Sequence, residues 1–314
     1  MILPLKLLRG EVHSILVGIY LKNTETNTIG TCRDRYALTM AKNTSAEFIL
    51  RPFAGMPAEA DLVAMREVVP AATIKARTTA EYGAKDFTFT TLLPESWPAL
   101  NRADGHVFLA LQTLAGSGDV SRDLAQNLLD AFELEPGMPL TSRVLPGPGP
   151  RLQDIVDLTL PFDVEMHEGF DYWVDPTEEI TAELRQALDG ASESVIDTKK
   201  LTGVDSAYWC RMGAKEFLRW AMPVEEEDVV NGIARLHAKR ESTIAGSKFL
   251  GAFRSCGIAI PVWELPKGTE AEEIEAAVVA FWPGLKAAME SAEPLDANER
   301  RARAGIISRQ VTLR

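Results

Sequence analysis

The chain has 314 residues and a mass of 34.4 kDa, which suits about two domains of roughly 150 residues each. Hydrophobic residues make up 46% and charged residues 25%, which excludes a disordered chain, a collagen-like fibre, a disulfide scaffold and an integral membrane protein. The formal net charge is -12 and the isoelectric point is about 5.0. Broad binding to nucleic acid or anionic lipid depends on clustered Lys and Arg, so this charge argues against both.

The cysteines and the N-terminus indicate the compartment. The chain has three cysteines, Cys32, Cys210 and Cys256. Their number is odd and no two of them are close in sequence, which is typical of a protein in the reducing cytoplasm. The apolar run Ser14 to Leu21 is too short to span a bilayer, which takes about 20 residues, and it lacks a signal-peptide cleavage pattern. We therefore expect residues 1–45 to be a poorly structured leader, with translation starting near Met40.

Proline and glycine divide the rest of the chain. The segment Leu145-Pro-Gly-Pro-Gly-Pro150 alternates the two strongest structure breakers and can be neither a helix nor a central strand. We expect a linker over 145–154 between an α+β domain at 46–144 and a second α+β domain at 155–292. A basic tail follows at 293–314.

Hydrophobic periodicity predicts the elements of the first domain. In chain order they are a strand at 48–51, a helix from Pro57 to Val69, strands at 86–91 and 106–112, and a helix with Ser121 as its N-cap.

The second domain begins with an alternating segment, 161–174, that predicts a hairpin or a bulged strand. Capping patterns then predict two helices, one from the Asp175 cap to Gly190 and one opened by Thr269 with Glu272. Strands are expected at 207–212, 216–221, 248–253 and 258–263, with a helix at 224–240.

The two domains resemble each other weakly. Leu50-Arg51 followed by Met56-Pro57 and acidic residues is similar to Leu218-Arg219 followed by Met222-Pro223 and acidic residues. A duplication explains this similarity, and so does helix-start chemistry alone. We predict an α+β protein with two pseudo-related halves, each an antiparallel or mixed sheet packed with amphipathic helices.

Common catalytic motifs are absent from the sequence. It has no Gly-rich phosphate loop, no GxSxG, no HExxH and no CxxC, and it gives no reason to expect a cofactor. Gly116-Ser-Gly-Asp119 lies between a predicted strand and a predicted helix start. Its backbone N–H groups suit an anion, or the segment is a flexible turn capped by Ser121.

The best metal-site candidate is the strip Asp163, Glu165 and His167. Strand alternation places the three side chains on one face, where two carboxylates and an imidazole suit a divalent metal or a general base. An antiparallel strand with one solvated face has the same pattern.

Charge is unevenly distributed over the second half of the chain. Ten acidic residues and a single base, Arg185, lie between Asp163 and Glu193, which suits either a basic partner or a solvated helix face. The tail from Leu295 to Arg314 has five arginines against two acids, so it suits nucleic acid, a protein partner or docking on the chain's own acidic surface.

Several segments resemble the actinobacterial family catalogued as domain of unknown function 5926. The matching segments include Arg51–Pro57, Arg66–Ala72, Gly147–Asp154, Gly169–Pro176, Tyr208–Arg211, Leu218–Trp220, Pro261–Trp263 and Ser308–Arg314. The resemblance implies no established activity. Relatives often carry a cysteine-rich, zinc-binding segment ahead of the shared region, but this chain has only Cys32 there, so four-ligand zinc binding is not expected.

Five residues within the matching segments are our candidate binding residues: Arg151, Asp154, Trp173, Arg219 and Trp220. Trp and Arg are common in interfaces, although Trp is also common in cores. We expect a cytoplasmic, non-catalytic binding or regulatory protein that recognises a protein partner in grooves between its halves. The alternatives are a metal-dependent hydrolase using Asp163, Glu165 and His167, and nucleic-acid binding through the arginine tail.

Overall fold

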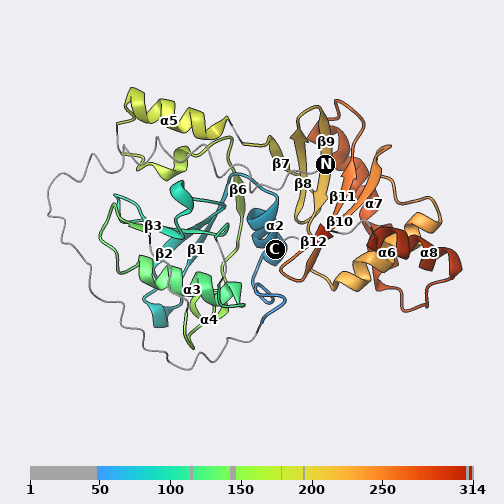
Figure 1. Cartoon of the computed structure of the whole chain (residues 1–314), viewed down its shortest axis with the longest axis horizontal. Coiled ribbons are helices and arrows are strands. Elements are labelled where there is room, and N and C mark those ends of the chain that lie inside the picture. Colours follow the sequence, from blue (N-terminus) through green and yellow to red (C-terminus); the bar gives the residue numbers. More distant parts are fainter. Residues whose placement is uncertain are drawn as a thin grey trace.

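The computed structural model describes residues 48–113, 116–141, 146–177, 179–193, 195–308 and 311–312. The expected leader at 1–45 lies outside these residues. In the described part of the chain, helices combine with two six-stranded sheets, so the predicted α+β class is confirmed. Figure 1 shows the sheets side by side, with the chain completing most of the first before it enters the second.

The first sheet has the strand order β5-β3-β4-β2-β1-β6. β2 and β4 are parallel, and the other neighbouring strands are antiparallel. In β2, Phe87 and Phe89 face one side and Thr88 and Thr90 the other, as the alternating sequence predicts. The strands are β1 (Ala72–Arg77), β2 (Asp86–Thr90), β3 (Ala99–Asn101), β4 (Val107–Ala110), β5 (Pro139–Leu140) and β6 (Val164–Met166).

Four α-helices accompany this sheet: α2 (Glu59–Glu67), α3 (Val120–Ala131), α4 (Leu152–Ile155) and α5 (Ala182–Ser192). Helices α2, α3 and α4 share a core with the inner face of the sheet, which carries Phe87 and Phe89. The opposite, outer face packs against α5 and a 3-10 turn, η4 (Asp171–Trp173).

The second sheet has the order β12-β10-β11-β9-β8-β7 and is antiparallel except for β12, which runs parallel to β10. Its strands are β7 (Thr198–Lys200), β8 (Ala207–Met212), β9 (Lys215–Trp220), β10 (Lys248–Ser255), β11 (Ile258–Glu264) and β12 (Val311–Thr312). Its outer face packs against α6 (Glu226–Ala238), α7 (Ala271–Glu290) and α8 (Ala297–Ile307).

Helix α2 joins the two sheets. Figure 1 shows it between them, and its residues from Ala60 to Met65 are between 0% and 5% exposed. One hydrophobic core includes Leu62 of α2, Phe89 of the first sheet and Ile260 of the second. The space between the halves that we expected to be a groove is therefore filled by this helix.

The proline-glycine segment does not mark the change from one sheet to the other. Residues 142–145 lie outside the described part, and α4 then starts at Leu152 and packs in the first core. Beyond the expected linker, β6 pairs with β1 and α5 covers the outer face of the first sheet, so the chain reaches the second sheet only at β7. The sequence could not show this because it gives the position of a break but not which sheet the next strand joins.

Local signals placed several boundaries incorrectly. α5 begins at Ala182 with Thr181 as its cap, not after Asp175, and it continues through Gly190. The N-cap of α3 is Asp119 instead of Ser121, and the capping box of α7 uses Glu270 with Glu273. Residues 48–51 form no strand, and the basic tail contains the helix α8. Several polar residues near a helix start can each act as cap, and tertiary packing selects among them.

None of the helices in the described residues is both long enough and apolar enough to cross a membrane.

Candidate functional site

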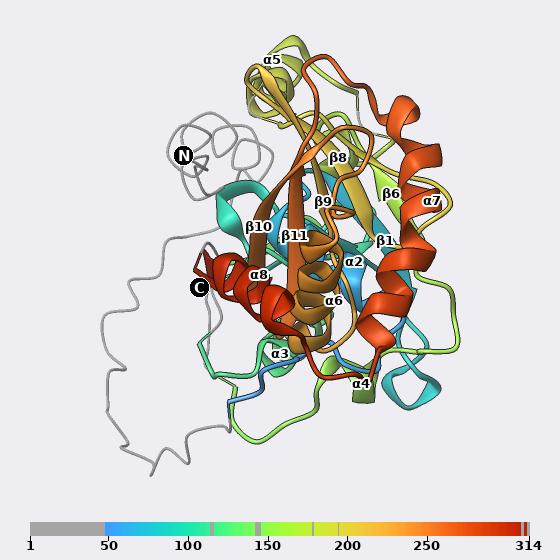
Figure 2. The same ribbon diagram turned by 90° about the vertical axis from the view of Figure 1, so that its right-hand side faces the viewer.

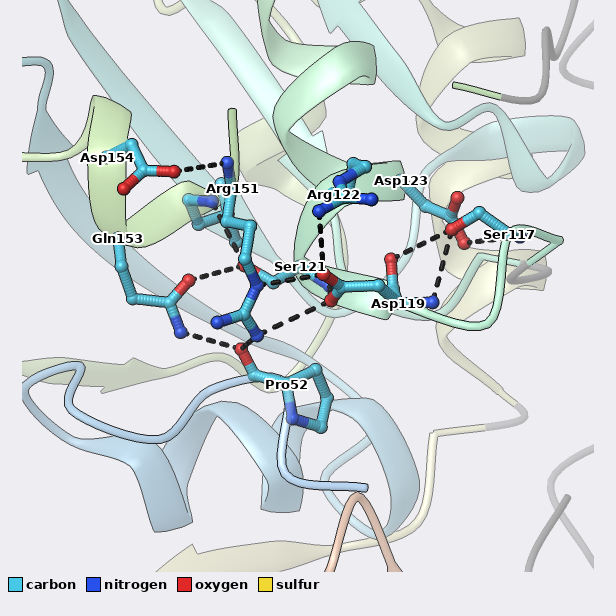
Figure 3. A network of polar contacts seen from close by, with 10 residues as sticks. Pro52, Ser117, Asp119, Ser121, Arg122, Asp123, Arg151, Gln153 and Asp154 are labelled. Carbon is cyan, nitrogen blue, oxygen red and sulfur yellow. Dashed lines mark hydrogen bonds and ion pairs between the residues drawn. The ribbon is translucent and has the colours of Figure 1, made fainter. Parts of the chain in front are cut away.

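Arg151 and Asp154 lie in a polar network at the start of α4 (Figure 3). The Asp154 carboxylate accepts from the Arg151 backbone N–H at 2.8 Å and completes a capping box. The Arg151 guanidinium donates to the fully buried Asp119 carboxylate at 2.8 Å and to the Pro52 carbonyl at 2.9 Å. Gln153 also donates to that carbonyl at 2.7 Å. The network therefore joins three segments distant in sequence, two of which belong to the segments that carry the family resemblance.

Two carboxylates of the protein itself already accept hydrogen bonds from the backbone of the loop at 116–119 and of the helix start that follows it. Asp119 accepts from the Ser121 backbone N–H at 3.1 Å, and the Asp123 carboxylate accepts from the N–H groups of Gly116 and Ser117 at 2.9 and 3.3 Å. Figure 3 shows both carboxylates beside the loop. An external anion would meet two internal negative charges here, so the geometry does not favour the phosphate-binding interpretation of this loop.

Arg219 is buried and lies at the C-terminal end of α2. Its guanidinium donates to the Val68 carbonyl at 3.0 Å, and a second nitrogen lies 2.8 Å from the sulfur of Met212. Among the described residues no carboxylate pairs with it, and its Nε has no hydrogen-bond partner. The partial negative charge at the C-terminal end of α2 therefore stabilises the positive charge of the Arg219 guanidinium. Arg219 positions α2 on the second sheet.

The two tryptophans among our candidate binding residues are core side chains. Trp173 is 1% exposed, stacks on Phe170 at 4.2 Å and donates to the Leu92 carbonyl. Trp220 is 2% exposed, donates to the Asp205 carbonyl and faces α7 through Trp282. Neither ring is available to a partner at the surface. The sequence could not distinguish these roles because Trp suits interfaces and cores alike.

Glu165 lies on β6, an edge strand of the first sheet, and Asp163 and His167 directly flank that strand. Asp163 and Glu165 are exposed, and the imidazole Nε2 of His167 lies within hydrogen-bond distance of the Thr73 hydroxyl, at 2.8 Å. Alternate residues of a strand are about 6.6 Å apart. Three alternate residues in a row are therefore spread too far along the strand for all three side chains to bind one ion. The described residues contain no group of three or more His, Cys, Asp or Glu side chains that could hold a metal ion.

A second histidine lies on the same outer face of the first sheet. His106 Nε2 lies 2.8 Å from the Thr88 hydroxyl. The Tyr172 ring contacts His167 at 4.5 Å between ring centres, and its hydroxyl accepts from Thr90 at 3.1 Å. Burial raises the pKa of Tyr172 to about 12, so this phenol stays neutral at physiological pH.

We expect acidification to destabilise the fold through His106 and His167. Burial lowers the pKa of both below 6.5, and for His106 the Arg102 charge lowers it further. Below about pH 6.5 the unfolded chain therefore binds more protons than the folded chain. This stability is complete above that pH and is lost as the pH falls through the folded pKa values. Urea unfolding at about pH 7.5 and about pH 5.5 should show a smaller loss in H106Q/H167Q than in wild type. Equal losses would contradict this assignment.

The burial of the described cysteines does not favour a nucleophilic role. Burial raises the pKa of both the Cys210 and the Cys256 thiols, so the reactive thiolate is scarce at neutral pH.

Sequence reasoning missed the polar contact that joins α2 to the second sheet. The buried Asp61 carboxylate accepts from the Tyr208 hydroxyl at 2.6 Å and from the Lys200 ammonium at 2.9 Å. Burial raises the pKa of Tyr208 well above 10, and the Asp61 charge acts in the same direction. The available signal was an acidic residue at a helix start, which usually remains in solvent.

The candidate residues therefore do not converge on one site. Arg151 and Asp154 lie at α4, Arg219 and Trp220 face opposite sides of the second sheet, and the β6 strip lies at an edge of the first. The exposed carboxylates between residues 163 and 193 lie instead on β6, η4, α5 and the turns that adjoin them.

Comparison with known proteins identifies a family and no relative of known activity. No curated protein and no solved structure matches the chain significantly. The model of a family of unknown function, DUF5926, matches residues 52–314, which is most of the chain and includes every element described above. The chain belongs to the DUF5926 family.

Proposed function

We propose that this protein is a non-catalytic, cytoplasmic binding protein that recognises a basic polypeptide partner through an acidic face. We define the acidic face as the exposed carboxylates of β6, η4, α5 and the adjoining turns. They are Asp163, Glu165, Glu168, Asp171, Glu179, Glu183, Asp189 and Glu193.

The observation that carries this proposal is the concentration of negative charge in one short segment. The described residues between 163 and 193 include nine acids and one arginine, a net charge of -8, against -12 for the whole chain. The single base, Arg185, already pairs with Asp171 at 2.9 Å. A field of one sign over so short a segment attracts an oppositely charged partner and speeds its association.

The face also offers an apolar contact. Ile180, next to Glu179, is 38% exposed, one of the few large aliphatic side chains that the described surface presents. The opposite side of α5 is anchored, since Leu184 and Leu188 are buried against the first sheet. An acidic segment with an exposed aliphatic residue just before an anchored helix suits a partner with basic and apolar residues.

The two alternative functions have less support. A hydrolase would need the β6 strip to assemble a metal site, and His167 turns to Thr73 instead. Nucleic-acid binding depends on the tail, and Arg309 and Arg314 lie outside the described residues. Arg303, within the described part, is engaged with Asn231 at 2.9 Å and with Glu227 at 3.5 Å.

Charge removal on the acidic face tests the proposal. We expect the variant E165Q/E168Q/E179Q/E193Q to bind a fluorescein-labelled peptide of alternating Lys and Ala about tenfold more weakly than wild type at low salt. Fluorescence anisotropy measures the dissociation constant, and the difference should shrink at high salt because exposed charges are screened.

A matched control removes the same charge elsewhere. The exposed residues Glu81, Glu133, Glu135 and Glu241 provide the variant E81Q/E133Q/E135Q/E241Q. We expect it to bind nearly as tightly as wild type. If both variants lose affinity equally, the acidic face has no special role. If only the acidic-face variant loses affinity, affinity purification from native cells with the same two variants identifies a physiological partner that depends on this face.

A further inference from the structure

The turn between β3 and β4 carries an arginine that reaches a segment far away in sequence. Arg102 directly follows β3, and its backbone N–H donates to the His106 carbonyl at 2.9 Å, which fixes the base of the side chain. Its guanidinium pairs with the Asp104 carboxylate through Nε at 3.1 Å and through Nη2 at 2.6 Å. The Arg102 side chain is only 11% exposed, so its charge is largely shielded from water.

The remaining nitrogen of Arg102 binds η4. Nη1 donates to the Tyr172 carbonyl at 2.9 Å and to the Val174 carbonyl at 3.1 Å, although these residues lie 70 and 72 positions further along the chain. A planar guanidinium suits the free carbonyls at the end of a helical turn, because its donors have fixed directions. The guanidinium also lies over the Phe108 ring, 4.9 Å from its centre, and Phe108 stacks on the Tyr172 ring. Arg102 therefore holds η4 on the outer face of the first sheet.

The segment that Arg102 holds lies at the centre of the acidic face. Asp171 directly precedes the first of the two carbonyls, and Glu179 and Glu183 follow them along the chain. The Asp175 carboxylate accepts from the Thr177 backbone N–H at 2.8 Å, which fixes a bend where the chain leaves η4 towards α5. The arrangement of the carboxylates on the two sides of this bend therefore depends on how η4 is held.

We propose that Arg102 is a positioning residue for recognition of the basic partner, an inference that rests on the proposed function. Arg102 makes no contact with the partner itself. It holds η4, and with it the neighbouring carboxylates, in the arrangement that the partner binds. A segment that is fixed before binding loses less conformational entropy on binding than a loose segment of the same charge, so it binds more tightly.

Charge and position predict opposite results for a change at Arg102. Arg102→Met removes a positive charge, and Coulomb attraction alone then makes the protein bind a basic peptide more tightly. If Arg102 acts by positioning, the same change weakens binding, because the partner must then order η4. The direction of the change in the dissociation constant therefore distinguishes the two effects.

The double variant R102M/D104N tests the effect of position at constant net charge. We expect it to bind the fluorescein-labelled Lys–Ala peptide about fivefold more weakly than wild type at low salt, and R102M alone also to bind more weakly. R102K keeps the charge but not the planar group, so it should recover part of the affinity. Hydrogen exchange should be faster than in wild type at the amides of η4 and α5 and unchanged in the second sheet.

A second ion pair on the same sheet provides the matched control. Arg77 pairs with Asp86 through the same two atoms, at 2.6 and 3.1 Å, and among the described residues no hydrogen bond joins either of them to η4. R77M/D86N should therefore bind the peptide like wild type. Circular dichroism melting checks folding, and if R102M/D104N does not fold, R102K gives the same comparison with a smaller expected loss.

Two results would overturn the positioning role and leave the proposed function intact. One is equal peptide affinity in R102M/D104N and R77M/D86N, and the other is tighter binding by R102M than by wild type. A wild-type chain that does not bind the peptide at low salt would overturn the proposed function and this inference together.

Discussion

Replacing Asp61 by alanine is expected to lower the free energy of unfolding by about 2–4 kcal/mol. The Asp61 carboxylate is buried between the sheets and accepts from Tyr208 and Lys200. Without it, the buried Tyr208 hydroxyl loses its partner and the Lys200 ammonium, with 28% of its side chain exposed, loses its counter-charge. Urea denaturation monitored by tryptophan fluorescence measures the change.

Two further variants distinguish the contribution of this buried contact to stability from that of an ordinary exposed ion pair. Tyr208→Phe removes only the hydroxyl and should cost about 1 kcal/mol, since Asp61 keeps Lys200. Asp86→Ala breaks the exposed Arg77–Asp86 pair and should cost less than about 1 kcal/mol. If Asp61→Ala costs no more than Asp86→Ala, the contact does not join the sheets as described.

Replacing Asp119 by alanine is also expected to have a large effect. It should lower the free energy of unfolding by about 2–4 kcal/mol. Asp119 caps α3 and is the counter-charge of Arg151, so alanine removes a helix cap and leaves a half-buried guanidinium unpaired. Asp119→Asn keeps the capping oxygen and should cost clearly less. Thermal and urea unfolding of the two variants, compared at one pH, measures both contributions.

Asp154 provides the matched control for this network. Its carboxylate is exposed and caps only the short helix α4, so Asp154→Ala should cost about 1 kcal/mol. The double variant D119A/R151M should be more stable than D119A alone, because no unpaired guanidinium remains. Equal stability of those two would show that the Asp119–Arg151 ion pair contributes little.

The regular elements of this protein are largely readable from its sequence. The alternation in 86–90 and the paired apolar runs around Cys256-Gly257 predict β2, β10 and β11, and the structure has all three. Local periodicity is sufficient there because each strand buries one face. β1 and β3 were not predicted. β1 is followed along the chain by a 3-10 turn instead of a tight hairpin, and β3 has only three residues.

The candidate site residues were harder to assign. Arg219 and Trp220 are neighbours in sequence but face opposite sides of the second sheet, towards α2 and α7 respectively. Asp119 was considered only as part of a loop, and Asp61 only as a helix-start acid. Whether such a residue is buried depends on segments that are far away in sequence, and no local pattern contains that information.

The sequence by itself determined the α+β class, the family, and the acidic stretch that the proposed function uses, because composition and spacing are properties of the chain alone. Only the tertiary structure decided that α2 fills the space between the sheets and that Arg151 and Arg219 bind the protein's own groups. It also decided that α6, α7 and α8 together cover the outer face of the second sheet (Figure 2). These features depend on the free energy of burying particular faces against each other, which is settled only when the whole chain packs.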